Sequence, residues 1–160
     1  MSIYLHIPGV SGNVTARAYT GWIQLESVQH QLHRHIKPTH VGDGNNRDYS
    51  LPRLGVFELV KHMDNSSSPI CQYFYSGKNI PTVEIVMTSD HDQNPYLSYT
   101  LDNVMVAYVH RFHDATQKRP LESIHLSYTR LEEKFTPYDE SQRMGTPVST
   151  GYDLVTAVSL

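Results

Sequence analysis

The chain has 160 residues, with 13 Lys and Arg against 16 Asp and Glu, which gives a formal net charge of −3. This length fits one domain that can bury a core without metal or disulfide support. The chain has no basic excess, so we expect no nucleic-acid partner. The single cysteine, Cys71, excludes an intramolecular disulfide and a cysteine zinc site. No apolar run approaches the roughly 20 residues that span a bilayer, so we expect no membrane insertion.

The dominant hydrophobic period is two, which predicts half-buried strands. Alternation predicts a first strand over residues 3–7, and aromatic and β-branched side chains predict a longer second strand over 19–30. Turn-forming residues concentrated over about 38–53 predict an extended, exposed loop. A strand pattern then resumes over 54–63.

We predict one short helix, at about residues 66–77. Serines that are candidate caps stand directly before Pro69, a plausible first helical residue. Apolar residues follow from Ile70 at the i, i+3, i+4 spacing of a helical stripe, and Gly77 can end the helix in the left-handed conformation. The apolar stripe is expected to face the sheet.

Strands are predicted again from residue 82 to 135, the longest over 96–112. In that strand Leu101, Met105, Ala107 and Val109 face one way, and Val104, Val106 and Tyr108 face the other. Because both faces of this strand are apolar, we expect other parts of the protein or another subunit to bury both of them. The tail, about 139–160, is expected to be irregular, with at most an edge strand over 152–158. Six or seven strands at this spacing predict a mainly β domain, a closed barrel or a sandwich.

Ten histidines raise the question of a metal site, and the densest group is His30, His33, His35 and His40. On a strand, His33 and His35 share a face that His30 does not, so a metal triad is awkward and polar surface residues are the better interpretation. The sequence contains no HExxH, GxSxG, Walker A or GxGxxG motif. Cys71 is interpreted as a small structural side chain. We therefore expect no catalytic residues, no cofactor and no metal.

Three classes of function stay open on the residues alone. The first is a structural assembly, which would cover the apolar strand surface between subunits. The second is a monomeric β-barrel binding module for a small ligand or glycan, and the third is a metal-dependent enzyme that uses the histidines. The only signal for the second class is a set of tyrosines that could stack on a ligand, namely Tyr96, Tyr99, Tyr108 and Tyr128.

Five groups of residues follow one another in the order seen in a known family. The chain opens with Ile3 to Gly12, followed by Gly21-Trp22-Ile23. Asp64 and Ser68-Pro69 precede Gly77-Lys78, and two strand motifs lie at 99–104 and 122–128. Across residues 2–138 this order resembles Hcp, the hemolysin-coregulated protein family of type VI secretion systems. Residues 30–40 and 139–160 match no pattern of the family.

The resemblance implies that residues 1–160 form one domain, a β-barrel of two packed antiparallel sheets with the short helix on its flank. It implies homo-hexameric rings that stack into a hollow tube, which a contractile sheath expels behind a spike protein of the VgrG type. Effector cargo would travel in the lumen. The protein would be in the bacterial cytoplasm before firing and then be secreted extracellularly or into a target cell. No Sec signal peptide is expected, since the first residues lack a basic and a sustained apolar region.

Two sets of residues are candidates for assembly contacts. The second apolar face of the long strand consists of Val104, Val106 and Tyr108. Because no predicted element of the chain covers this face, we expect these residues at the subunit interface. The family extends the loop that corresponds to 38–53 from the ring. The candidates for ring stacking are therefore Gly42, Asp43, Gly44, Asn45, Asn46 and Arg47.

Overall fold

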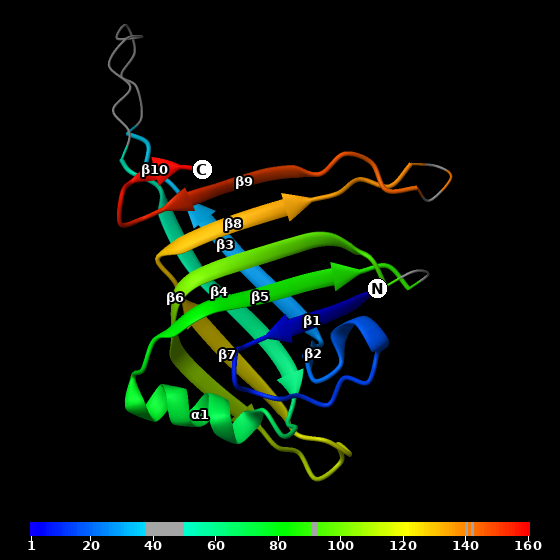
Figure 1. Ribbon diagram of the computed structural model, residues 1–160. Helices are drawn as coiled ribbons and strands as arrows, with labels where there is room; N and C mark the ends of the chain where they lie inside the picture. Colours follow the sequence, from blue (N-terminus) through cyan, green and yellow to red (C-terminus); the bar gives the residue numbers. More distant parts are fainter. Residues whose placement is uncertain (38–49, 91–92, 140, 142) are drawn as a thin grey trace, which may run out of the picture.

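The computed structural model describes residues 1–37, 50–90, 93–139, 141 and 143–160. Two antiparallel sheets pack face to face, and one short helix lies at the end of the molecule opposite β9 and β10 (Figure 1). The mainly β class, with two packed antiparallel sheets and a flanking helix, is thus confirmed.

The larger sheet has seven strands. In spatial order they are β10 (Val158–Ser159), β9 (Val148–Asp153), β8 (Arg130–Phe135), β6 (Pro95–Phe112), β5 (Ile80–Thr88), β1 (Ser2–His6) and β2 (Ile23–Leu25). Only the first half of β6, up to Val104, takes part, and it pairs with β5 on one side and β8 on the other. We call this sheet the large sheet.

The second sheet has four strands and shares β6 with the first. Its order is β3 (Ser27–His33), β4 (Arg53–His62), β7 (Leu121–Ser127) and the second half of β6, from Met105 to Phe112. The chain also passes between the sheets at Glu26, whose N–H donates to the Val60 carbonyl at 2.8 Å. The backbone thus continues from one sheet to the other at Glu26 and within β6. Because these two connections lie on opposite sides of the core, the two sheets form a barrel. We call this second sheet the four-stranded sheet.

The space between the sheets holds the main hydrophobic core. Its fully buried side chains include Leu5, Phe57, Ile85, Leu101 and Leu126, each from a different strand. Burying a side chain of this size contributes about 1.5–3 kcal/mol. A smaller cluster lies on the outer face of the large sheet, where Tyr19 stacks on Tyr4 with ring centroids 4.7 Å apart.

Two predicted strands are in fact pairs of strands. Residues 19–30 begin at the end of a 3-10 helix, η1 (Arg17–Tyr19), and then divide at Glu26 into β2 and β3. The run 124–135 divides at Tyr128 and Thr129 into β7 and β8. At each division the chain leaves one sheet for the other. The tail expected to be irregular contributes β9 and β10.

The alternation predicted for the long strand β6 is wrong because the strand has two irregularities. Asn103 has a positive φ of 53°, and the register with β7 shifts between Val106 and Tyr108. Each irregularity changes which side chains face the barrel interior. As a result Leu101, Val104, Val106 and Val109 all belong to the main core or pack against it.

The helix α1 (Ser67–Ser76) confirms the prediction, but its start differs. Ser66 makes no side-chain capping bond, and Pro69 is the third helical residue. The Asp64 carboxylate instead accepts the backbone N–H of Ser66 at 2.9 Å. At the other end Gly77 adopts the left-handed conformation, with φ 62°, and its N–H donates to the Tyr73 carbonyl.

Candidate functional site

The histidines do not form a metal centre in the part of the chain that the structure describes, where no group of three or more His, Cys, Asp or Glu side chains could hold an ion. His30 turns into the barrel, stacks on Phe57 at 4.2 Å and shares a 2.8 Å hydrogen bond with the Tyr128 hydroxyl. His33 ends β3, and His40 lies outside the described residues. Among the described residues, no helix is long and apolar enough to span a membrane.

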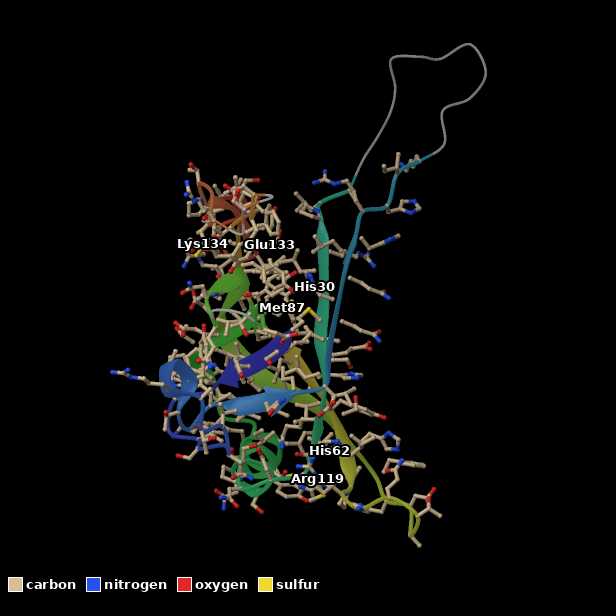
Figure 2. The ribbon with its side chains drawn as sticks, turned by 90° about the vertical axis from the view of Figure 1, so that its right-hand side faces the viewer. His30, His62, Met87, Arg119, Glu133 and Lys134 are labelled. Atoms are coloured by element: carbon tan, nitrogen blue, oxygen red, sulfur yellow. The ribbon has the colours of Figure 1, made fainter. Side chains whose placement is uncertain are left out.

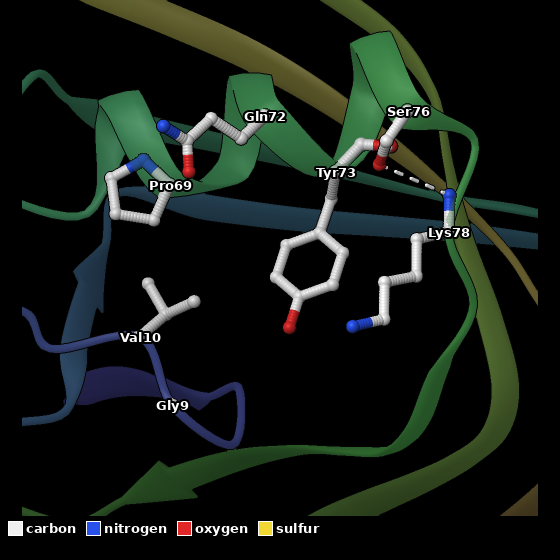
Figure 3. A pocket seen from close by; sticks show the side chains of 7 residues that line it. All are labelled: Gly9, Val10, Pro69, Gln72, Tyr73, Ser76 and Lys78. Atoms are coloured by element: carbon white, nitrogen blue, oxygen red, sulfur yellow. Dashed lines mark hydrogen bonds between the residues drawn. The ribbon is translucent and has the colours of Figure 1, made fainter.

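A pocket of about 380 Å³ opens between α1 and the turn at Gly9 and Val10 (Figure 3). The Tyr73 hydroxyl and the Lys78 ammonium point into it. The set of lining residues is completed by Pro69, Gln72 and Ser76. These groups can bind a small polar molecule. None of the four tyrosines that the sequence suggested for ligand stacking lines this pocket.

Two of the motifs that carry the family resemblance meet in a buried ionic cluster beneath α1. The Lys61 ammonium lies 2.8 Å from Asp64 Oδ1 and 2.8 Å from Glu122 Oε1. The Ser67 hydroxyl donates to the same Glu122 oxygen, and Arg111 Nε lies 3.2 Å from the other. Buried charges need such partners, since an unpaired one is strongly destabilising. This cluster attaches α1 to the four-stranded sheet.

The three residues predicted at the subunit interface differ in burial. Val104 is 0% exposed and Val106 is 6% exposed, both within the main core, whereas Tyr108 is 45% exposed. The reason given for the prediction, that all three lack cover, is therefore wrong for the two valines. The irregularities in β6 turn those valines into the barrel. Tyr108 remains available for a contact with another subunit.

The four-stranded sheet presents two strand edges, at opposite sides. Among the described residues, β3 pairs with β4 alone, and residues 105–112 of β6 pair with β7 alone. Met105, Tyr108 and Phe112, all on this part of β6, are exposed apolar or aromatic side chains. Leu32 on β3 is also exposed. Edge strands with apolar side chains are prone to pair with another chain.

The outer face of the four-stranded sheet carries polar side chains at its centre. Its side chains project away from the large sheet (Figure 2). One cross-strand row consists of Gln29, Glu58, His125 and Tyr108, one residue from each strand. The sequence pattern did not reveal this face, although Glu58 and His62 on β4 and Ser123 and His125 on β7 alternate with buried residues.

Ionisable side chains also lie between the two sheets. His30 and Glu133 come from the facing sides of the four-stranded sheet and the large sheet (Figure 2). Burial lowers the pKa of His30, while the Glu133 charge acts in the opposite direction. Burial and the neighbouring Glu133 carboxylate raise the pKa of Tyr99 to about 12. This region therefore favours neutral imidazole and neutral phenol.

The residues proposed for ring stacking, Gly42 to Arg47, lie outside the described residues. Their role stays a prediction.

Comparison with known folds gives matches over nearly the whole chain. A type VI secretion system protein of known structure superposes with a TM-score of 0.92 at 20% identity, covering 99% of both chains. Hcp1 from Salmonella typhimurium gives 0.81 at 22% identity, covering 99% of this chain and 98% of that chain. A type VI secretion system effector from Yersinia pestis gives 0.75 at 18%, covering 94% and 98%. At these identities the matches show a common fold.

The family is established by sequence. Among curated proteins the chain has no match. The sequence model of the family described as "Type VI secretion system effector, Hcp" matches residues 4–135, which is most of the chain. The chain therefore belongs to the Hcp family of type VI secretion system effectors.

Proposed function

We propose that this protein is a structural subunit of the inner tube of a type VI secretion system. Six copies form a ring, rings stack into a hollow tube, and the tube is secreted and carries effectors in its lumen. Its partners are further copies of itself, a spike protein of the VgrG type, the contractile sheath and the cargo. Family membership supports this proposal, and the observation that carries it is the pair of edges on the four-stranded sheet.

The two edges are suited to a head-to-tail contact. All neighbouring strands of the four-stranded sheet are antiparallel, so its two outermost strands, β3 and β6, run in opposite directions. When a second copy is placed beside the first in the same orientation, β3 of one copy meets β6 of the next in antiparallel fashion. Such a contact joins two different surfaces, and repeated rotation closes it into a ring.

The proposed contact also covers the apolar side chains on the edges. Met105, Tyr108 and Phe112 would approach the β3 edge of the neighbouring copy, which carries Leu32. This assignment retains Tyr108 as an interface residue and leaves Val104 and Val106 in the subunit core. Strand pairing would give hydrogen-bond partners to the edge N–H and C=O groups that the isolated chain exposes to solvent.

The position of the large sheet indicates which face would line the lumen. The large sheet covers the inner side of the four-stranded sheet (Figure 1). A closed ring has more room outside than inside, so the large sheet belongs on the outside. The bare polar face with Gln29, Glu58 and His125 would then line the channel.

Light scattering on a size-exclusion column tests the proposal. We expect a mass of about 110 kDa, six times the 18.3 kDa chain. The double substitution Met105→Lys/Phe112→Lys places charges on the β6 edge and should give folded monomers, because burying lysine side chains against the neighbouring edge is unfavourable. Val155→Lys, at a more exposed apolar residue in the β9–β10 turn, is the control away from this edge and should leave the ring intact. A monomeric wild-type protein at every concentration would contradict the proposal.

A further inference from the structure

The pocket of about 380 Å³ beside α1 is built from one face of the helix and from the turn that follows β1 (Figure 3). The residues of the helix face are spaced as i, i+3, i+4 and i+7, namely Pro69, Gln72, Tyr73 and Ser76. Gly9 and Val10 form the opposite side. We call this space the helix pocket.

Lys78 completes the helix pocket because the chain turns at the end of α1. Gly77 ends the helix in the left-handed conformation, with a φ of 62°. The Ser76 hydroxyl accepts the backbone N–H of Lys78 at 3.3 Å, which holds the first residues after the helix against its last turn. The ammonium group of Lys78 and the hydroxyl of Tyr73 therefore point into the same space (Figure 3).

The core of the protein holds both sides of the helix pocket in place. Val10 is 6% exposed and belongs to the main core, and the Tyr73 side chain packs against that core. The Val10 N–H donates to the Ile7 carbonyl at 3.0 Å, which fixes the turn. The pocket is therefore formed before a ligand enters, and its volume lies within the range of about 300–1,000 Å³ that is usual for small-molecule sites.

Three polar groups of the helix pocket have no partner in the part of the chain that the structure describes. They are the Gln72 side-chain amide, the Tyr73 hydroxyl and the Lys78 ammonium. No lining residue is acidic, so the positive charge of Lys78 is not balanced within the pocket. The Tyr73 carbonyl, near the negative end of the helix dipole, already accepts the Gly77 N–H at 3.0 Å. The pocket thus offers hydrogen-bond donors and one unbalanced positive charge.

We propose that the helix pocket binds a small organic carboxylate with an apolar body. The carboxylate accepts hydrogen bonds from the Lys78 ammonium and the Tyr73 hydroxyl, and such charge-assisted bonds are stronger than neutral ones. The apolar body lies against Val10 and Pro69. The Gln72 amide, next to Pro69, can bind a second polar group of the ligand (Figure 3). A phosphate dianion is a poorer match, because one ammonium group balances only half of its charge.

Methyl NMR of the full chain, titrated with sodium benzoate as the probe, tests the proposal. We expect the Val10 methyl signals to shift, with a Kd in the millimolar range, while those of Val155 in the β9–β10 turn stay unchanged. Benzamide, which has nearly the same shape without the charge, should bind at least about tenfold more weakly. Inorganic phosphate should not displace benzoate.

Two substitutions separate the charge from the hydroxyl. Lys78→Gln keeps a long polar side chain without the charge, so we expect benzoate binding about tenfold weaker or more. Tyr73→Phe keeps the ring and removes the hydroxyl, and we expect a loss of about three- to tenfold. Lys118→Gln, at an exposed lysine between β6 and β7, is the matched control and should bind benzoate as the wild type does. Thermal melting confirms that each variant is folded.

The outcomes separate this proposal from the proposed function, because no lining residue belongs to the β3 or β6 edge. Unshifted Val10 signals, equally tight binding of benzamide, or a Lys78→Gln variant that binds like the wild type would overturn the proposal. Displacement of benzoate by phosphate would overturn the preference for a carboxylate. Light scattering on the same samples reports the ring: a ring that does not bind benzoate contradicts only this inference, and a monomer that binds it contradicts only the ring.

Discussion

The Lys61 ammonium lies 2.8 Å from the Glu122 carboxylate, and neither side chain is more than 1% exposed. The two residues are register partners on β4 and β7. Lys61 also donates a hydrogen bond to the hydroxyl of Ser67, the first residue of α1, so the ion pair is connected to the helix. A charged pair thus occupies a position that a hydrophobic contact would otherwise take. It joins two strands of the four-stranded sheet to the helix.

Glu122→Gln should destabilise the fold strongly, because it removes one charge from this buried cluster. Loss of one partner in such a site costs about 3–5 kcal/mol of the free energy of unfolding. Urea denaturation measures the change. Glu132→Gln is the control: its pair with Arg130, at 3.6 Å, is partly exposed, and the expected change is at most about 1 kcal/mol. Similar losses in both variants would contradict a special role for the cluster.

Gly77→Ala should destabilise α1 through the backbone alone. Gly77 has a φ of 62°, where a side chain is unfavourable by about 1–2 kcal/mol. A Cβ atom at this position would meet the Met105 methyl group only at 4.0 Å, so no steric clash adds to the effect. Thermal unfolding should show a lower Tm for Gly77→Ala. An unchanged Tm would mean that the helix end relaxes, and Ser76→Ala serves as the exposed neighbouring control.

The stability of the wild type should fall as the pH decreases from about 7 to 5, in part through His30. Burial lowers the pKa of His30, so the folded state binds its proton more weakly than the unfolded state. The stabilisation is present above the unfolded pKa of about 6.5 and is lost as the pH falls below it. His30→Gln should reduce this loss, measured by urea denaturation at each pH. His6→Gln, outside the barrel, should retain it.

Through Tyr99, whose pKa is raised to about 12, the stability should fall as the pH increases in alkali, which is the opposite of the effect of His30. The neutral phenol is favoured in the folded state, so stability is present below a pH of about 10 and falls as the pH rises toward 12. Glu133→Gln removes the neighbouring carboxylate and should lower the pKa of Tyr99, as read by ultraviolet titration of the tyrosines. An identical titration curve in the variant would exclude this electrostatic contact.

Deletion of Gly42 to Arg47 should abolish stacking while leaving single rings intact. This expectation rests on the sequence and on the proposed tube. Electron microscopy of the variant and light scattering would distinguish stacked tubes from single rings. Tubes of normal length would contradict a stacking role for these residues.

Most of the elements could be predicted because their signals are local. Alternation over 3–7 and 54–63 identified β1 and β4, and Gly77 correctly marked the end of α1. The corners at Glu26 and Thr129 were missed because a change of sheet depends on distant partners. A strict period of two also failed for β6, where the positive φ of Asn103 is a tertiary feature. Because the alternation was taken as strict, Val104 and Val106 were predicted at an interface rather than in the core.

Strand β6 crosses from one sheet to the other in one run of 18 residues, about 60 Å of extended chain. In the proposed tube, its second half would form the seam between subunits and its first half would lie in the outer wall. A pulling force on the channel lining would then reach the outer wall along covalent bonds, without passing through side-chain contacts. Each subunit would carry a tensile element that joins the inside of the tube to its outside.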